Sequence, residues 1–168
     1  AQVKGLGLKQ YYSDLAAKIK LEKEENKEYA NLFGYYEVLC RYLSVKGELG
    51  IELKAAYDSG NLVALTELEK DTISACLDYL EELRVLREEL WFAEHNPFGY
   101  EVIDIRLGGV KARLEYASRR VRAYLDKKID RLPELESKRL LFREDLKDKD
   151  MKLTSCNYWK GIVTAGNM

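Results

Sequence analysis

Apolar residues recur at steps of three and four along most of this chain, while proline is almost absent. Only two prolines occur in 168 residues, and the first stands at position 97. Steps of three and four place side chains on one face of an α-helix, and long runs without proline lack the strongest helix breaker. The pattern therefore predicts an all-α fold, a bundle of three to four long antiparallel amphipathic helices.

Four segments carry this pattern: about 8–24, 28–57, 62–95 and 109–129. Their apolar stripes are wider than the narrow seam of a coiled coil, which favours a bundle. Between the second and third segments stands "DSGN" at 58–61. Gly60 suits the left-handed position after a helix end, and Asn61 can cap the next helix. Pro133 is expected to mark the end of the fourth helix.

The stretch 90–109 gathers the chain's single histidine, one proline, several aromatic residues and a Gly-Gly pair. Pro97 disfavours helix at Asn96, so we expect an irregular connector near 96–108 before the fourth helix. Two interpretations stay open: a packed helix connection, or a surface shaped for a partner domain or ligand. The candidate contacts, with a partner domain or at the mouth of a substrate site, are Trp91, Asn96, Phe98, Tyr100, Asp104 and Arg106.

Two glycine pairs need a structural reason. Gly47 and Gly50 share one face of the second predicted helix, and each costs about 1 kcal/mol relative to alanine inside a helix. Close approach of another backbone or of a bulky side chain would explain them. Gly108 and Gly109 are expected to let the backbone turn closely before the fourth helix.

The ends of the chain differ from its centre. Residues 1–8 are linker-like, residues 140–157 are polar and expected to be mobile, and the last residues are rich in aromatic and β-branched types. We predict a single helical domain over 1–168. Because the chain starts without an initiator methionine, we expect it to be an excised C-terminal piece of a larger protein.

The residues needed for familiar chemistry are missing. A di-iron bundle requires two Glu-x-x-His motifs, but Phe92 stands three residues before the one histidine, His95. At the end of a helix His95 is explained by the helix dipole. Tyr36 and Tyr124 lie on apolar stripes, which favours core packing over stacking on sugars or bases. We therefore predict no catalytic residue, no cofactor and no metal ligand in this chain.

The composition indicates which binding partners and which cellular compartment to expect. The formal net charge of −1 and pI near 6.0 give no electrostatic reason to bind nucleic acid. No apolar run is long enough for a membrane span. The three cysteines have no metal-like or disulfide-like spacing, so reduced thiols in a cytoplasmic protein are predicted. Cys40 and Cys76 lie in helical apolar patterns, which predicts core packing.

The segment "LWFAEHNPFGYEVIDIRLGGVKARL" at 90–114 closely resembles one in the C-terminal, all-helical domain of bacterial glycoside hydrolase family 20 enzymes, the β-N-acetylhexosaminidases. The likeness continues in "YEVLCRYLSVKGELGIELKAAYDSG" at 36–60, in "AYLDKKIDRLPELE" at 123–136 and in "IVTAG" at 162–166. The matching positions in the first segment are Trp91, Asn96-Pro97-Phe98-Gly99, Asp104, Arg106 and Gly108-Gly109.

The resemblance implies a parent enzyme that removes terminal N-acetylglucosamine or N-acetylgalactosamine with the help of the substrate's own acetamido group, outside the usual two-carboxylate scheme. The catalytic Asp-Glu pair of such enzymes lies on a (β/α)8 barrel, and this chain lacks the alternating strand–helix pattern of a barrel. The implied partners are the barrel of the same parent chain and a second subunit in a homodimer. The rival hypothesis is a free-standing helical scaffold or adaptor for protein–protein interaction.

Overall fold

The computed structural model describes residues 5–137, and every regular element in that range is helical. The first pair is α1 (Leu8–Glu25) and α2 (Ala30–Asp58), joined by the short 3₁₀ helix η1 (Lys27–Tyr29). α1 packs along α2. Its first backbone N–H, on Leu8, donates to Glu48 Oε1 at 3.0 Å. The predicted all-α fold is confirmed.

The turn at 58–61 has the predicted chemistry. Gly60 has a φ of 65°, in the left-handed region. Asn61 precedes α3 (Leu62–Glu67), and its side-chain oxygen accepts from the backbone N–H of Ala64 at 3.0 Å. A left-handed glycine therefore ends α2, and an asparagine cap begins the next helix.

The third predicted helix is one continuous rod with a π-helical section. α3 passes into η2 (Leu68–Ile73), which is π-helical, and then into α4 (Ser74–Glu94). A π turn contains more residues than an α turn, so it shifts which side chains face inward. In this section Glu69 is buried, at 4% exposed, whereas the neighbouring apolar Leu68 is only partly buried.

The predicted irregular connector at 96–108 is wrong. The loop covers only 95–99, and α5 (Tyr100–Leu125) begins well before residue 109. Gly108 and Gly109 lie inside this helix and make no turn. The apolar stripe of α5 extends back through Leu107, which packs on the core. Packing of that stripe on α4 outweighs the cost of two helical glycines, about 1 kcal/mol each.

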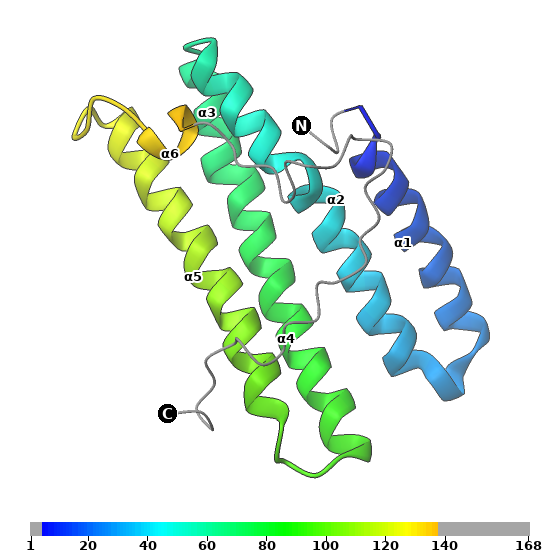
Figure 1. Ribbon diagram of the computed structural model, residues 1–168. Helices are drawn as coiled ribbons and strands as arrows, with labels where there is room; N and C mark the ends of the chain where they lie inside the picture. Colours follow the sequence, from blue (N-terminus) through cyan, green and yellow to red (C-terminus); the bar gives the residue numbers. More distant parts are fainter. Residues whose placement is uncertain (1–4, 138–168) are drawn as a thin grey trace, which may run out of the picture.

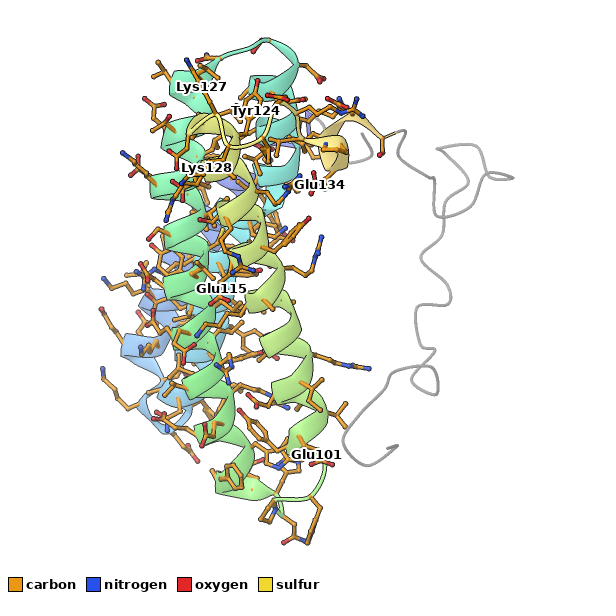
Figure 2. The ribbon with its side chains drawn as sticks, turned by 90° about the vertical axis from the view of Figure 1, so that its left-hand side faces the viewer. Glu101, Glu115, Tyr124, Lys127, Lys128 and Glu134 are labelled. Carbon is orange, nitrogen blue, oxygen red and sulfur yellow. The ribbon has the colours of Figure 1, made fainter. Side chains whose placement is uncertain are left out.

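The end of α5 also differs from the prediction. The helix stops at Leu125, where Lys127 adopts a left-handed φ of 57° and its N–H donates to the Tyr124 carbonyl at 3.0 Å. Such a left-handed cap ends a helix without proline. Pro133 instead begins α6 (Pro133–Glu136), where its fixed φ suits a first helical position. Figure 2 shows Glu101 and Tyr124 at opposite ends of α5, with Glu134 of α6 beside its C-terminal half.

The long helices lie side by side in the order α1, α2, α4, α5, each antiparallel to its neighbour in the chain (Figure 1). The core lies between α2, the α3–α4 rod and α5. Its least exposed side chains are Leu65, Ile73, Cys76 and Leu80. Within residues 5–137, no helix combines the length and apolar character needed to cross a membrane.

Two sequence expectations about buried side chains have opposite outcomes. Cys40 and Cys76 are free thiols and are buried, as predicted. Tyr124 packs against the core, but Tyr36 is 46% exposed, so its predicted core position is wrong. Tyr36 lies on the outer side of α2, where its ring makes an edge contact with neighbouring Tyr35. Residues 140–157 lie outside the described range.

Candidate functional site: the turn between α4 and α5

Backbone geometry fixes the α4–α5 turn, which we define as residues 95–99. Gly99 has a φ of 100°, a conformation that favours glycine. Its N–H donates to Glu101 Oε2 at 2.8 Å, so an acidic side chain satisfies a donor at the start of α5. The Tyr100 N–H reaches the Pro97 carbonyl at 3.3 Å. The turn is therefore short and internally bonded.

Trp91 holds the turn from its α4 side. Its indole N–H donates to the Asn96 carbonyl at 2.8 Å, and the His95 ring stacks on it with centroids 4.6 Å apart. The indole also lies against Gly99, where a Cβ would come within 3.5 Å of Trp91 Cζ2. Tyr100 completes the aromatic cluster, with its ring 6.0 Å from that of Trp91. His95 thus has a packing role in the described structure.

Phe98, on the same turn, is almost fully exposed to solvent. It is 89% exposed, the highest value among the exposed large apolar side chains of residues 5–137. Phe92 on α4 and Ile105 on α5 are 48% and 41% exposed. Three large apolar side chains at this end of α4 and α5 are therefore in contact with water.

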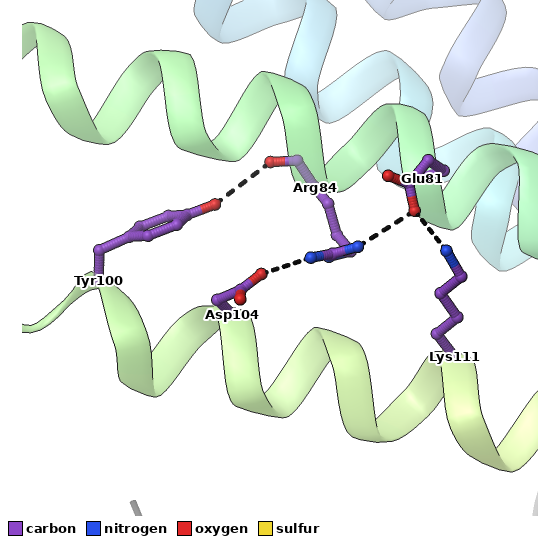
Figure 3. Close-up of polar contacts among 5 residues, drawn as sticks. All are labelled: Glu81, Arg84, Tyr100, Asp104 and Lys111. Atoms are coloured by element: carbon purple, nitrogen blue, oxygen red, sulfur yellow. Dashed lines mark hydrogen bonds and ion pairs between the residues drawn. The ribbon is translucent and has the colours of Figure 1, made fainter. Parts of the chain in front are cut away.

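Polar contacts tie α4 to α5 beside the turn (Figure 3). Arg84 Nη2 donates to Asp104 Oδ1 at 2.6 Å, and Arg84 Nη1 donates to Glu81 Oε2 at 3.1 Å. Lys111 Nζ donates to the same Glu81 oxygen at 2.9 Å. The Tyr100 hydroxyl lies 3.4 Å from the Arg84 carbonyl, a long hydrogen bond. The ion pairs fix α5 on α4.

The contacts of Glu81 and Arg84 stabilise the charged forms of these two side chains. The hydrogen bond from Lys111 lowers the pKa of Glu81, and the hydrogen bond to Asp104 raises the pKa of Arg84. Partial burial raises the pKa of Tyr100. A general acid at neutral pH needs a carboxyl whose pKa is raised instead. Glu81 is therefore suited to an ion pair.

The remaining predicted residues fall on other surfaces. Asp104 and Arg106 do not share a face, because residues two apart on a helix point apart. Arg106 faces α2 across a groove that Gly50 and Gly109 also line. A Cβ on Gly47 would meet Leu8 Cβ at 3.3 Å, so this glycine accommodates α1 on α2. Gly108 lies within α5, away from these contacts.

One buried polar group escaped the sequence analysis. Glu69 of η2 accepts a hydrogen bond from Ser118 Oγ at 2.7 Å and forms an ion pair with Arg122 Nη2. In the sequence, the only indication of this buried group is a glutamate close to the apolar positions of the helix. Within residues 5–137, no group of three His, Cys, Asp or Glu side chains is arranged to hold a metal ion.

An antiparallel array of long helices, with ion pairs between α4 and α5 and an exposed phenylalanine on the turn between them, defines an all-helical domain. The chain belongs to the family described as the Glycoside Hydrolase 20C C-terminal domain, whose sequence model matches residues 1–154. The resemblance to family 20 C-terminal domains is thereby confirmed. No curated protein matches the chain.

Proposed function

We propose that this chain is the non-catalytic helical domain of a β-N-acetylhexosaminidase that releases terminal N-acetylglucosamine or N-acetylgalactosamine. In this proposal residues 1–168 form one C-terminal domain, and the α4–α5 turn packs on the catalytic (β/α)8 barrel of the same parent chain. Membership in the family supports a larger parent protein with a catalytic domain. The observation that carries the packing surface is the 89% exposure of Phe98 on a short turn that is held by hydrogen bonds.

The energetics favour such a contact. Burying an exposed phenylalanine contributes about 1.5–3 kcal/mol, and a turn that is already ordered loses little conformational entropy on binding. The hydrogen bond from the Trp91 indole to the Asn96 carbonyl holds the turn that carries Phe98. Phe98 thus has the properties of an anchor residue at the centre of an interface.

A binding experiment with separated domains tests the surface. The barrel of the parent protein and this chain are purified separately, and their association is measured by calorimetry. We expect Phe98→Ala to weaken binding about tenfold or more, as for an interface anchor. Val63→Ala is the matched control, since Val63 is 69% exposed at the opposite end of the α3–α4 rod. Equal affinities for the two variants would refute the turn as the contact surface.

Activity and assembly assays test the rest of the proposal. A chromogenic N-acetylglucosaminide should be hydrolysed by the parent protein and left intact by this chain alone, so turnover by the chain would contradict a non-catalytic role. The proposed homodimer predicts twice the monomer mass for the parent protein in light scattering. We also assign the protein to the cytoplasm, on the ground that Cys40 and Cys76 are free thiols and that the cysteine spacing is not disulfide-like, and cell fractionation tests this assignment.

A further inference from the structure

The α3–α4 rod changes its helical register along its length. Leu62 and Leu80 are 18 positions apart, about five turns of 3.6 residues, so an uninterrupted α-helix would place both on one face. In the structure Leu80 is 1% exposed, whereas Leu62 is 49% exposed. The π-helical section η2 lies between them. One extra residue in a helix rotates the part before it by about 100°, which accounts for the outward position of Leu62.

A π-helical section is rare, so η2 needs a contact that compensates for its poorer geometry. Glu69 lies in η2 and is the one buried charged side chain of residues 5–137. Its Oε1 accepts a hydrogen bond from Ser118 Oγ at 2.7 Å and pairs with Arg122, and both partners belong to α5. The Arg122 side chain is 62% exposed, so the ion pair lies at the edge of the core.

An uninterrupted α-helix would direct the Glu69 carboxylate elsewhere. Eleven positions, about three turns, separate Glu69 from Leu80, so the two side chains would share one face. Leu80 is fully buried in the core between α2, the rod and α5. A carboxylate buried there without a partner is strongly unfavourable. The π-helical section instead turns Glu69 toward the hydroxyl and guanidinium groups of α5.

We propose that Glu69 selects between two registers of the α3–α4 rod. Its contacts with Ser118 and Arg122 hold η2 in the π form, and without the carboxylate the rod becomes one continuous α-helix that turns Leu62 inward. Glu69 thus positions α3 relative to α5. This proposal is independent of the proposed function, because it concerns packing within the domain.

A thiol at position 62 reports the register. Leu62→Cys is made in a Cys156→Ser background, in which Cys40 and Cys76 are buried, and the rate of its reaction with a thiol reagent is measured on the native chain. Adding Glu69→Leu should slow this reaction about tenfold or more, because a thiol that is turned into the core reacts only after local opening.

Two controls separate a change of register from a general effect. Glu67→Leu makes the same chemical change at an exposed position of α3 and should leave the reaction at position 62 unchanged. A thiol reporter at Val85, 49% exposed on α4, lies beyond η2 and should react at the same rate with and without Glu69→Leu. Slowing at both reporters would overturn the proposal, because a register change affects only the α3 side of η2.

Deletion of Lys70 fixes the register covalently. Lys70 is exposed within η2, and the loss of one residue there leaves a continuous α-helix in which Glu69 still faces α5 and Leu62 still faces outward. In this background Glu69→Leu should no longer slow the reaction at position 62. Slowing of equal size with and without Lys70 would contradict the proposal, since no second register would then be involved.

A crystal structure of the Glu69→Leu chain shows the register directly. An α-helical section at 68–73 with Leu62 turned inward supports the proposal. Glu69→Ala removes the carboxylate without adding bulk to the core and is expected to give the same change. A retained π-helical section with Leu62 exposed, in either variant, would overturn the proposal, as would an unchanged reaction rate at position 62 in variants of normal helix content.

Discussion

Arg84 on α4 and Asp104 on α5 form an ion pair of 2.6 Å across the two helices beside the exposed turn. The guanidinium also reaches Glu81, which in turn binds Lys111, so the contacts alternate between the helices. The turn and the ion pairs lie at neighbouring positions along α4 and α5. The orientation of Phe98 therefore depends on a helix pair that is held by both packing and charge.

Replacing Asp104→Asn should lower the free energy of unfolding by about 1 kcal/mol, because the pair is partly shielded and charge-assisted. Urea titration of the variant and of the unmodified chain measures the difference in free energy of unfolding. Asp58→Asn is the control: its pair with Lys54 is exposed and local to α2, and about 0.3 kcal/mol is expected. Equal losses in the two variants would show that the α4–α5 pair has no special weight.

Gly99→Ala and Gly108→Ala should change stability in opposite directions. Gly99 combines a φ of 100° with the Trp91 ring 3.5 Å from its virtual Cβ, so alanine there should cost about 1–2 kcal/mol. Gly108 has helical geometry within α5, and alanine there should stabilise by up to about 1 kcal/mol. Thermal unfolding followed by circular dichroism measures both. A gain at Gly99, or a loss at Gly108, would contradict the assigned backbone roles.

The thiols of Cys40 and Cys76 should resist modification in the folded protein. Burial raises the pKa of Cys76 to about 11 and also raises that of Cys40, so little thiolate forms at neutral pH. In a Cys156→Ser background, a colorimetric thiol reagent should react slowly with native protein and rapidly with both cysteines in denaturant. Rapid reaction without denaturant would indicate that α2 and α4 separate easily.

Helix positions were predictable where one apolar stripe ran through most of a segment. The helices at 8–24 and 28–57 were placed within a few residues, although Lys46 breaks the stripe of the second once. The prediction failed at 100–108, where Asp104 and two glycines obscured the stripe. That segment is helical because Leu107 meets the core supplied by other helices, and a local pattern does not contain this information.

Long-range partners were not predictable in the same way. Asp104 pairs with Arg84, and Glu69 with Ser118 and Arg122, across helices whose rotation about their axes the sequence does not specify. The π-helical section η2 adds to this difficulty, because it changes which residues face inward. Phe98 was identified as a candidate contact from the sequence. Its high exposure was not predictable, because the turn that carries it is shorter than the expected connector.

Glu134 should make stability depend on pH in the acid range. The hydrogen bond from the Tyr116 hydroxyl, at 2.6 Å, and those from its own backbone N–H and from Arg120 lower its pKa from 4.5 to about 2. A carboxyl whose pKa is lower in the folded state stabilises the protein above its unfolded value and loses that contribution as pH falls from about 4.5 to 2. Since the side chain is 37% exposed, solvent screening should keep the contribution to about 1 kcal/mol.

The measurement compares Glu134→Gln with the unmodified chain by urea titration between pH 7 and pH 2. The difference in free energy of unfolding should be largest at neutral pH and should shrink below about pH 4.5. Tyr116→Phe removes the main hydrogen-bond donor and should abolish part of the same difference, whereas Tyr11→Phe, on exposed α1, should leave it intact. Glu81 and Asp126 also have lowered pKa values and contribute to stability in the acid range. Their contributions are the same in the unmodified chain and in Glu134→Gln, so they cancel in the difference between the two free energies of unfolding. A difference that stayed constant with pH would mean that the contacts between α5 and α6 do not stabilise the Glu134 carboxylate.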